Sequence, residues 1–96
     1  MARNVIWSLR AREDRKAIFA YWNDHNKSKE YSRKLNKLFK EAIQLLKSHP
    51  YIGRKTALPD VYVKIVRQYL LIYEVTDSDI ILHTIWDGRR NPDDMF

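Results

Sequence analysis

The segment Ile80-Ile81-Leu82-His83-Thr84-Ile85-Trp86-Asp87-Gly88-Arg89-Arg90-Asn91-Pro92 decides how this fold closes. Its apolar run predicts a final strand over Ile80–Trp86, and Gly88 and Pro92 bracket two arginines where the chain must leave the sheet. Guanidinium groups bind phosphate or carboxylate through paired hydrogen bonds, so the arginine pair predicts an anion-binding corner. The anion is nucleic acid, a protein partner, or the neighbouring Asp93 and Asp94.

Two helices are expected before this strand. The first runs from Leu9 to about His25, with Ser8 as its N-cap. The second runs from about Lys29 to His49 and ends there because a residue that precedes proline is driven out of the helical conformation. It has the strongest helical periodicity in the sequence, with an apolar stripe of Tyr31, Leu35, Leu38, Phe39, Ala42, Leu45 and Leu46.

The other apolar segments predict strands. They are Val5–Trp7, Val61–Arg67 and Tyr69–Val75, with a connector over Tyr51–Asp60 and a polar turn at Thr76–Asp79 before the last strand. The order β-α-α-β-β-β predicts an α+β fold in which two N-terminal helices pack on a mainly antiparallel four-stranded sheet. The length predicts a single domain over residues 1–96.

Composition is typical of a small cytoplasmic protein. The chain contains no cysteine, which excludes disulfides and thiolate metal sites and fits a reducing compartment. No apolar stretch approaches the roughly 20 residues that a membrane-spanning helix needs, and the N-terminus does not lead into a signal peptide. We therefore expect a cytoplasmic protein that does not bind membranes.

The positive charge is concentrated in the first half of the chain. Residues 1–55 contain 14 Lys/Arg against 5 Asp/Glu, whereas residues 56–96 contain 4 against 7. The net charge of +6 therefore comes from the helices and the connector rather than from the predicted strands. A basic surface of this kind favours polyanions or an acidic protein partner.

No pattern for a metal or a cofactor is present. His25, His49 and His83 lack metal-ligand spacing, and the only two glycines, Gly53 and Gly88, cannot form a glycine-rich phosphate loop. No serine or threonine has a convincing catalytic partner. We expect neither a bound metal nor a cofactor.

Four motifs follow one another along nearly the whole chain. They are Trp7-Ser8 before Ala11 and Asp14, Leu46-x-x-x-Pro50-x-x-Gly53-Arg54, the tyrosine-rich segment Arg67–Tyr73, and the closing Ile85–Pro92. In this order and spacing the chain resembles the RelE/ParE superfamily of bacterial toxins from type II toxin–antitoxin modules. The resemblance implies a growth-inhibitory toxin that a cognate antitoxin neutralises, as in plasmid stabilisation. The complex of the two proteins often represses its own operon, so operator DNA is expected as a partner only through that complex.

The superfamily contains two mechanisms. Members similar to RelE cleave mRNA on the ribosome, which requires an acid, a base and cations around the phosphate. Members similar to ParE inhibit DNA gyrase, and the toxin itself then needs no acid or base. Here no tyrosine follows Tyr73, although the RelE pattern places one near its C-terminus, and Val61–Arg67 lacks the acid of a glutamate–histidine pair.

Candidate site residues follow from the resemblance and from charge. For a ribonuclease they are Arg67, His83 and Arg89; for binding an anion or a target they are Arg54, Lys55, Arg67, Trp86, Arg89 and Arg90. His83 is a candidate because histidine is the residue type most suited to proton transfer near neutral pH. Trp86 is the best candidate for a stacking platform because it adjoins the arginines.

Each candidate also has a purely structural interpretation. His83 alternates with Ile81 and Ile85, as a partly buried structural histidine would. Arg67 can pair with Glu74 or Asp60 across a hairpin, and the arginine pair can bind Asp87, Asp93 or Asp94. Tryptophans are more often core residues than stacking platforms.

The missing acid and base favour gyrase inhibition, with DNA gyrase as the target. The alternatives are a ribosome-dependent mRNA endonuclease and a non-toxic basic module that acts only within an operator-binding complex. Whether the chain is an enzyme stays open at the level of the sequence.

Overall fold

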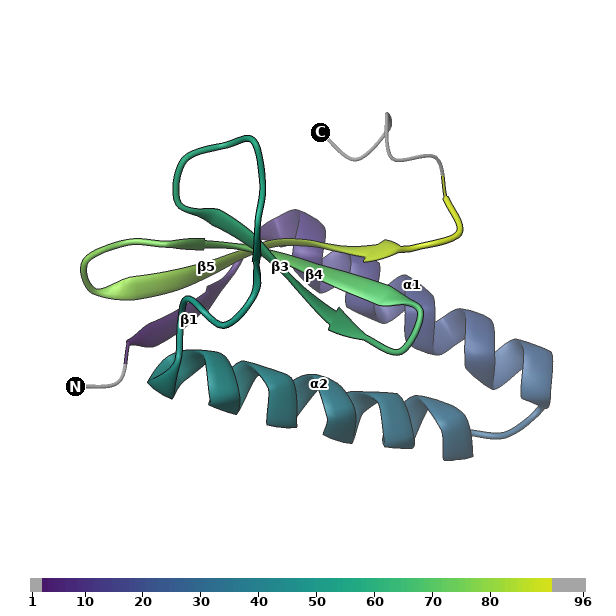
Figure 1. Ribbon diagram of the computed structural model, residues 1–96. Coiled ribbons are helices and arrows are strands. Elements are labelled where there is room, and N and C mark those ends of the chain that lie inside the picture. Colours follow the sequence, from purple (N-terminus) through teal and green to yellow (C-terminus); the bar gives the residue numbers. More distant parts are fainter. Residues whose placement is uncertain (1–2, 91–96) are drawn as a thin grey trace.

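The computed structural model describes residues 3–90, which form two helices and one mixed sheet (Figure 1). The helices are α1 (Leu9–Asn26) and α2 (Glu30–Ser48). The strands are β1 (Asn4–Trp7), β2 (Arg54–Lys55), β3 (Val61–Val66), β4 (Tyr69–Val75) and β5 (Asp79–Asp87). In the sheet order β1-β5-β4-β3-β2, the pair β1–β5 is parallel and the other neighbours are antiparallel.

The expected α+β class and the two helices before the main strands are confirmed. The prediction of four strands is wrong, because a fifth strand, β2, lies within the segment expected to be a connector. With only two residues, β2 is too short to leave a periodic pattern in the sequence. The parallel pairing of β1 with β5 was also not predicted. These two strands are far apart in the sequence, and the connection between them contains both helices.

The first helix replaces β1 at the edge of β5. β1 pairs with β5 only from Asp79 to Leu82, and there the chain turns into α1. Ser8 makes this turn possible, because its N–H donates to the Leu82 carbonyl at 3.0 Å and its hydroxyl donates to the His83 carbonyl at 2.9 Å. The same hydroxyl oxygen accepts from the Ala11 N–H at 3.0 Å, which is the expected N-cap.

Asp14, further along α1, makes the next hydrogen bonds between this helix and β5. Its carboxylate accepts hydrogen bonds from the Ile85 N–H at 3.1 Å and from the Thr84 hydroxyl. Without Asp14, the unpaired half of β5 would present an unsatisfied backbone donor to the helix. Ala11 is the only fully buried residue of α1, whereas Ile18, Phe19 and Trp22 are partly buried and pack against the core. The polar contacts with β5 add to this packing.

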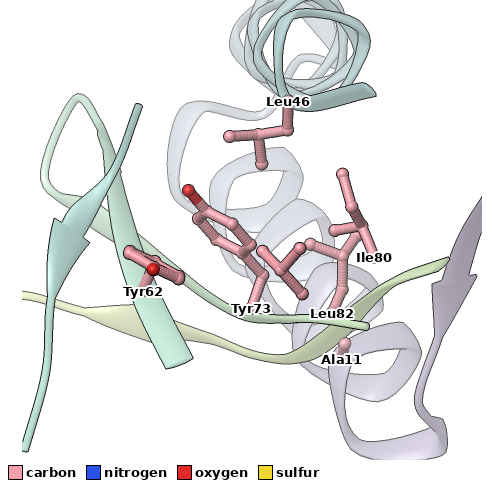
Figure 2. Packing of buried hydrophobic residues seen from close by; sticks show 7 residues of the cluster. Ala11, Leu46, Tyr62, Tyr73, Ile80 and Leu82 are labelled. Atoms are coloured by element: carbon pink, nitrogen blue, oxygen red, sulfur yellow. The ribbon is translucent and has the colours of Figure 1, made fainter. Parts of the chain in front are cut away.

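The second helix covers one face of the sheet with its apolar stripe. Leu35, Phe39, Ala42 and Leu46 are buried against strand side chains, whereas Leu45 on the flank of the stripe is 38% exposed. Figure 2 shows Leu46 pointing from α2 toward the ring of Tyr73 on β4. Neither α1 nor α2, which are the helices of the described chain, is apolar enough to cross a membrane.

Tyr73 ties the connector after α2 to the sheet. Its hydroxyl donates to the Pro50 carbonyl at 2.8 Å and accepts from the Gly53 N–H at 3.1 Å. A Cβ at Gly53 would lie 2.6 Å from that hydroxyl oxygen, so the connector can approach only with glycine at this position. The spacing Leu46-x-x-x-Pro50-x-x-Gly53 therefore places three residues around one tyrosine.

Removal of the Asp14 carboxylate tests the hydrogen bonds between α1 and β5. We expect Asp14→Ala to lower the free energy of unfolding by about 2 kcal/mol, because the Ile85 N–H and the Thr84 hydroxyl each lose their partner. For a chain of this size the melting temperature should fall by roughly 10 °C. The matched control is Glu13→Ala, which removes an exposed acid from the same helix and should have little effect.

The Tyr73 hydroxyl predicts a loss of stability at alkaline pH. Burial raises the pKa of this hydroxyl above its ordinary value of 10.0, while the bond from Gly53 opposes the shift. The neutral form is thus favoured in the folded state, so its contribution is present below about pH 10 and is lost as the pH rises through the raised pKa. Urea unfolding should show the stability gap between wild type and Tyr73→Phe shrinking from pH 8 to pH 11. The exposed Tyr51→Phe should show no such change.

Candidate functional site

A cleft of about 270 Å³ lies between α1 and the end of β5. Its floor is apolar, and its rim carries both arginines of the closing segment together with two carboxylates. The lining residues are Asp14, Ala17, Ile18, Tyr21, Tyr69, Ile85, Asp87, Arg89 and Arg90. An apolar cleft with a charged rim is suited to bind a protein side chain and the charges beside it.

Arg89 is held in place by Asp87. The guanidinium donates from Nε to Oδ1 at 3.1 Å and from a terminal nitrogen to Oδ2 at 2.7 Å. This hydrogen bonding holds the pKa of Asp87 below its ordinary value. The pairing with Asp87 expected from the sequence is confirmed, and Asp93 and Asp94 lie outside the described residues. With 63% of its side chain exposed, Arg89 remains accessible to a partner.

Arg90 covers Trp86. Its guanidinium carbon lies 4.1 Å from the ring centroid, and that of Arg10 on α1 lies 5.8 Å from it. Only 1% of Trp86 is exposed, so the ring is a core residue whose face is not open to a nucleobase in this arrangement. Trp86 therefore positions Arg90 through a cation–π contact.

Tyr69 forms the inner wall of the cleft and connects it to the C-terminal half of α1. Its hydroxyl accepts a hydrogen bond from Trp22 Nε1 at 2.7 Å. Burial raises the pKa of Tyr69, so the hydroxyl is neutral under ordinary conditions. Tyr21, 50% exposed, stands at the mouth of the cleft and supplies an aromatic surface there.

Arg67 does not join the arginine pair. It lies in the β3–β4 turn with a φ of 58° and lines a different groove, between α2 and β3. The expected pair with Glu74 is wrong, because the hairpin register places Glu74 opposite Val61, at the other end of β3. The turn is nevertheless fixed to the end of β5, since the Gly88 N–H donates to the Gln68 carbonyl at 2.7 Å.

His83 pairs with Glu74, which the sequence analysis missed. His83 Nε2 lies 2.8 Å from Glu74 Oε1, and the two side chains are 39% and 36% exposed. Ile72 pairs with Thr84 and Tyr73 pairs with Leu82, so His83 is an extra, unpaired residue of β5 that forms a β-bulge. Beyond this bulge the side-chain alternation shifts by one residue, and Ile85 is buried in the core while His83 is not. Glu74 lies opposite Ile81 in the β4–β5 register, and His83 follows Ile81 by two residues, so the two side chains are diagonal neighbours. That diagonal relation could have predicted the contact.

The candidate residues thus fall into separate places. Arg89 and Arg90 share the α1–β5 cleft, Arg67 lines the α2–β3 groove, and Arg54 and Lys55 form β2 at the opposite edge of the sheet from β1. Neither of these two clefts is lined by more than one of Arg67, His83 and Arg89. Within residues 3–90, no group of three acidic or histidine side chains is placed to hold a metal ion.

Comparison with known proteins identifies relatives of the chain. A family model described as the ParE toxin of the type II toxin–antitoxin system parDE matches residues 5–92. No curated protein sequence matches. Among solved structures, a chain of the chromosomal ParDE toxin–antitoxin system from P. aeruginosa is similar, with a TM-score of 0.73 at 18% identity. The similarity covers 88% of this chain and 94% of that one, and it shows the same fold.

The contact between Arg90 and Trp86 predicts a change in solvent access. We expect Arg90→Ala to increase acrylamide quenching of tryptophan fluorescence, because the ring loses the guanidinium that covers it at 4.1 Å. Arg89→Ala removes the same charge from the neighbouring residue and should leave quenching unchanged, because Arg89 is held by Asp87. Equal quenching in the two variants would contradict this role of Arg90.

Proposed function

This chain belongs to the ParE toxin family of type II toxin–antitoxin systems, and on that basis we propose that it arrests growth in the cytoplasm by binding DNA gyrase. It is the toxin component of such a module. The α1–β5 cleft, with the exposed Arg89 and Arg90 on its rim, is the surface that we assign to the target.

The main support for this proposal is that the candidate ribonuclease residues Arg67, His83 and Arg89 do not share one cleft. Cleavage of RNA needs a base, an acid and a cation around one phosphate. Arg67 and Arg89 line different clefts, and His83 lines neither of them. Binding to gyrase requires no such assembly, and it uses what the cleft offers, namely oriented guanidinium groups beside an apolar floor.

The second surface of the proposal is the α2–β3 groove, which we assign to the cognate antitoxin. β2 pairs with β3 only at Tyr62 and Val63, so the outer edge of β3 has no neighbouring strand from Lys64 to Val66 in the described part of the chain. Beside that edge lie Leu38, Leu45 and Ile65 as apolar anchors. An extended or helical antitoxin segment with apolar side chains and acidic neighbours fits this groove.

The Glu74–His83 pair favours the ribosome-dependent endonuclease as a second candidate, because it supplies an acid–base pair. This function requires codon-phased mRNA cuts on translating ribosomes that His83→Ala abolishes.

A gyrase assay tests the main proposal. Purified wild-type chain should inhibit supercoiling of relaxed plasmid by gyrase, and Arg89→Ala/Arg90→Ala should weaken this inhibition at least tenfold, because the oriented cations are lost. Addition of the cognate antitoxin should restore supercoiling. The matched control is Arg54→Ala/Lys55→Ala, which removes two exposed cations from β2 and should inhibit as the wild type does.

Two outcomes would contradict the proposal. Normal supercoiling together with mRNA cuts in cells that express the chain would assign it to the ribosome. A loss of inhibition in the β2 variant, with the Arg89/Arg90 variant still active, would move the target contact away from the α1–β5 cleft.

A further inference from the structure

A third surface, the groove between α1 and α2, takes no part in the proposed contacts. Its volume is about 500 Å³, and its lining is dominated by cations from both helices. The lining residues are Arg12, Arg15, Lys16, Phe19, Asn36 and Lys40. We name it the α1–α2 groove and propose that it binds the phosphate backbone of duplex DNA.

The charge of the groove is uncompensated. No carboxylate lines it, and none of its four cations lies within ion-pair distance of an acid among residues 3–90. Four positive charges held side by side repel one another, so the site is more stable with a polyanion bound. The excess of Lys/Arg in the first half of the chain, which contains both helices, adds to the attraction of the protein for polyanions.

The cations are arranged to contact successive phosphates. Arg12 and Lys16 lie one helical turn apart on α1, and Lys40 extends from α2 across the groove. Residues at this i, i+4 spacing are about 6 Å apart at Cβ, close enough to neutralise neighbouring phosphates of one strand. Arg15 is held by its stack on Trp7, with the guanidinium carbon 4.4 Å from the ring centroid.

Nucleic acid fits the groove better than an acidic protein segment does. Protein interfaces depend on apolar anchors in buried pockets, and here the only apolar lining residue is Phe19, whose ring already stacks on Phe39 at 6.2 Å. Phosphates need only cations and polar donors, such as the amide of Asn36. The choice of DNA over RNA rests on the proposed gyrase target, which holds duplex DNA.

Fluorescence anisotropy tests this inference without gyrase, so its result is independent of the supercoiling assay. The purified full chain is titrated into a fluorescein-labelled 20-base-pair DNA duplex at several KCl concentrations. Four phosphate contacts predict a slope of log K against log salt of roughly −3.5. Lys16→Ala/Lys40→Ala should reduce the magnitude of this slope by about 2 and weaken binding about tenfold or more at 100 mM salt.

The matched control is Lys34→Ala/Lys64→Ala, which removes two cations that lie outside the groove. Because both altered lysines of the test variant are exposed, its melting temperature should equal that of the wild type. An unchanged slope in the groove variant, or an equal loss in the control variant, would overturn the inference. Displacement of the duplex by polyglutamate at matched charge would assign the groove to an acidic protein. Binding to an RNA duplex at least tenfold tighter than to DNA would overturn the assignment to DNA.

Discussion

The hydrogen bonds between α1 and the unpaired half of β5 are the constraint on which the rest of the structure depends. A strand with one free edge must satisfy its backbone groups or pair with another chain. The N-cap residue Ser8 and Asp14 of α1 satisfy them, at the Leu82 and His83 carbonyls and the Ile85 N–H. The helix is thereby locked beside the strand end, and the cleft between them takes its shape from this contact.

Two tyrosines of β4 hold further segments against the sheet. The buried Tyr73 hydroxyl binds the connector after α2, and the Tyr69 hydroxyl binds Trp22 of α1. Each tyrosine therefore contributes an apolar ring to the core and one polar atom that positions a segment distant in sequence. Together they hold α1 and the connector in fixed places around one sheet.

The arrangement of the two helices on the sheet leaves three surfaces, and each has a different chemistry. The α1–β5 cleft combines apolar floor and oriented guanidinium groups, the α2–β3 groove offers leucines beside a free strand edge, and the α1–α2 groove presents cations almost alone. In the proposal made above, the α1–β5 cleft contacts the target and the α2–β3 groove contacts the antitoxin. If the α1–α2 groove binds DNA and the α1–β5 cleft binds gyrase, the toxin contacts the nucleic acid as well as the enzyme that acts on it.

Periodicity and turn chemistry along the sequence determined both helices, the N-cap at Ser8 and three long strands, because these depend on neighbours within a few residues. The order and spacing of four short motifs indicated the family. Only the tertiary structure decided the parallel pair, the Glu74–His83 contact and the burial of Trp86 under Arg90, because each depends on strand register or on residues far apart in the chain. A single extra residue in β5 was enough to turn Ile85 into the core and leave His83 beside Glu74, and local sequence preferences do not encode such a shift.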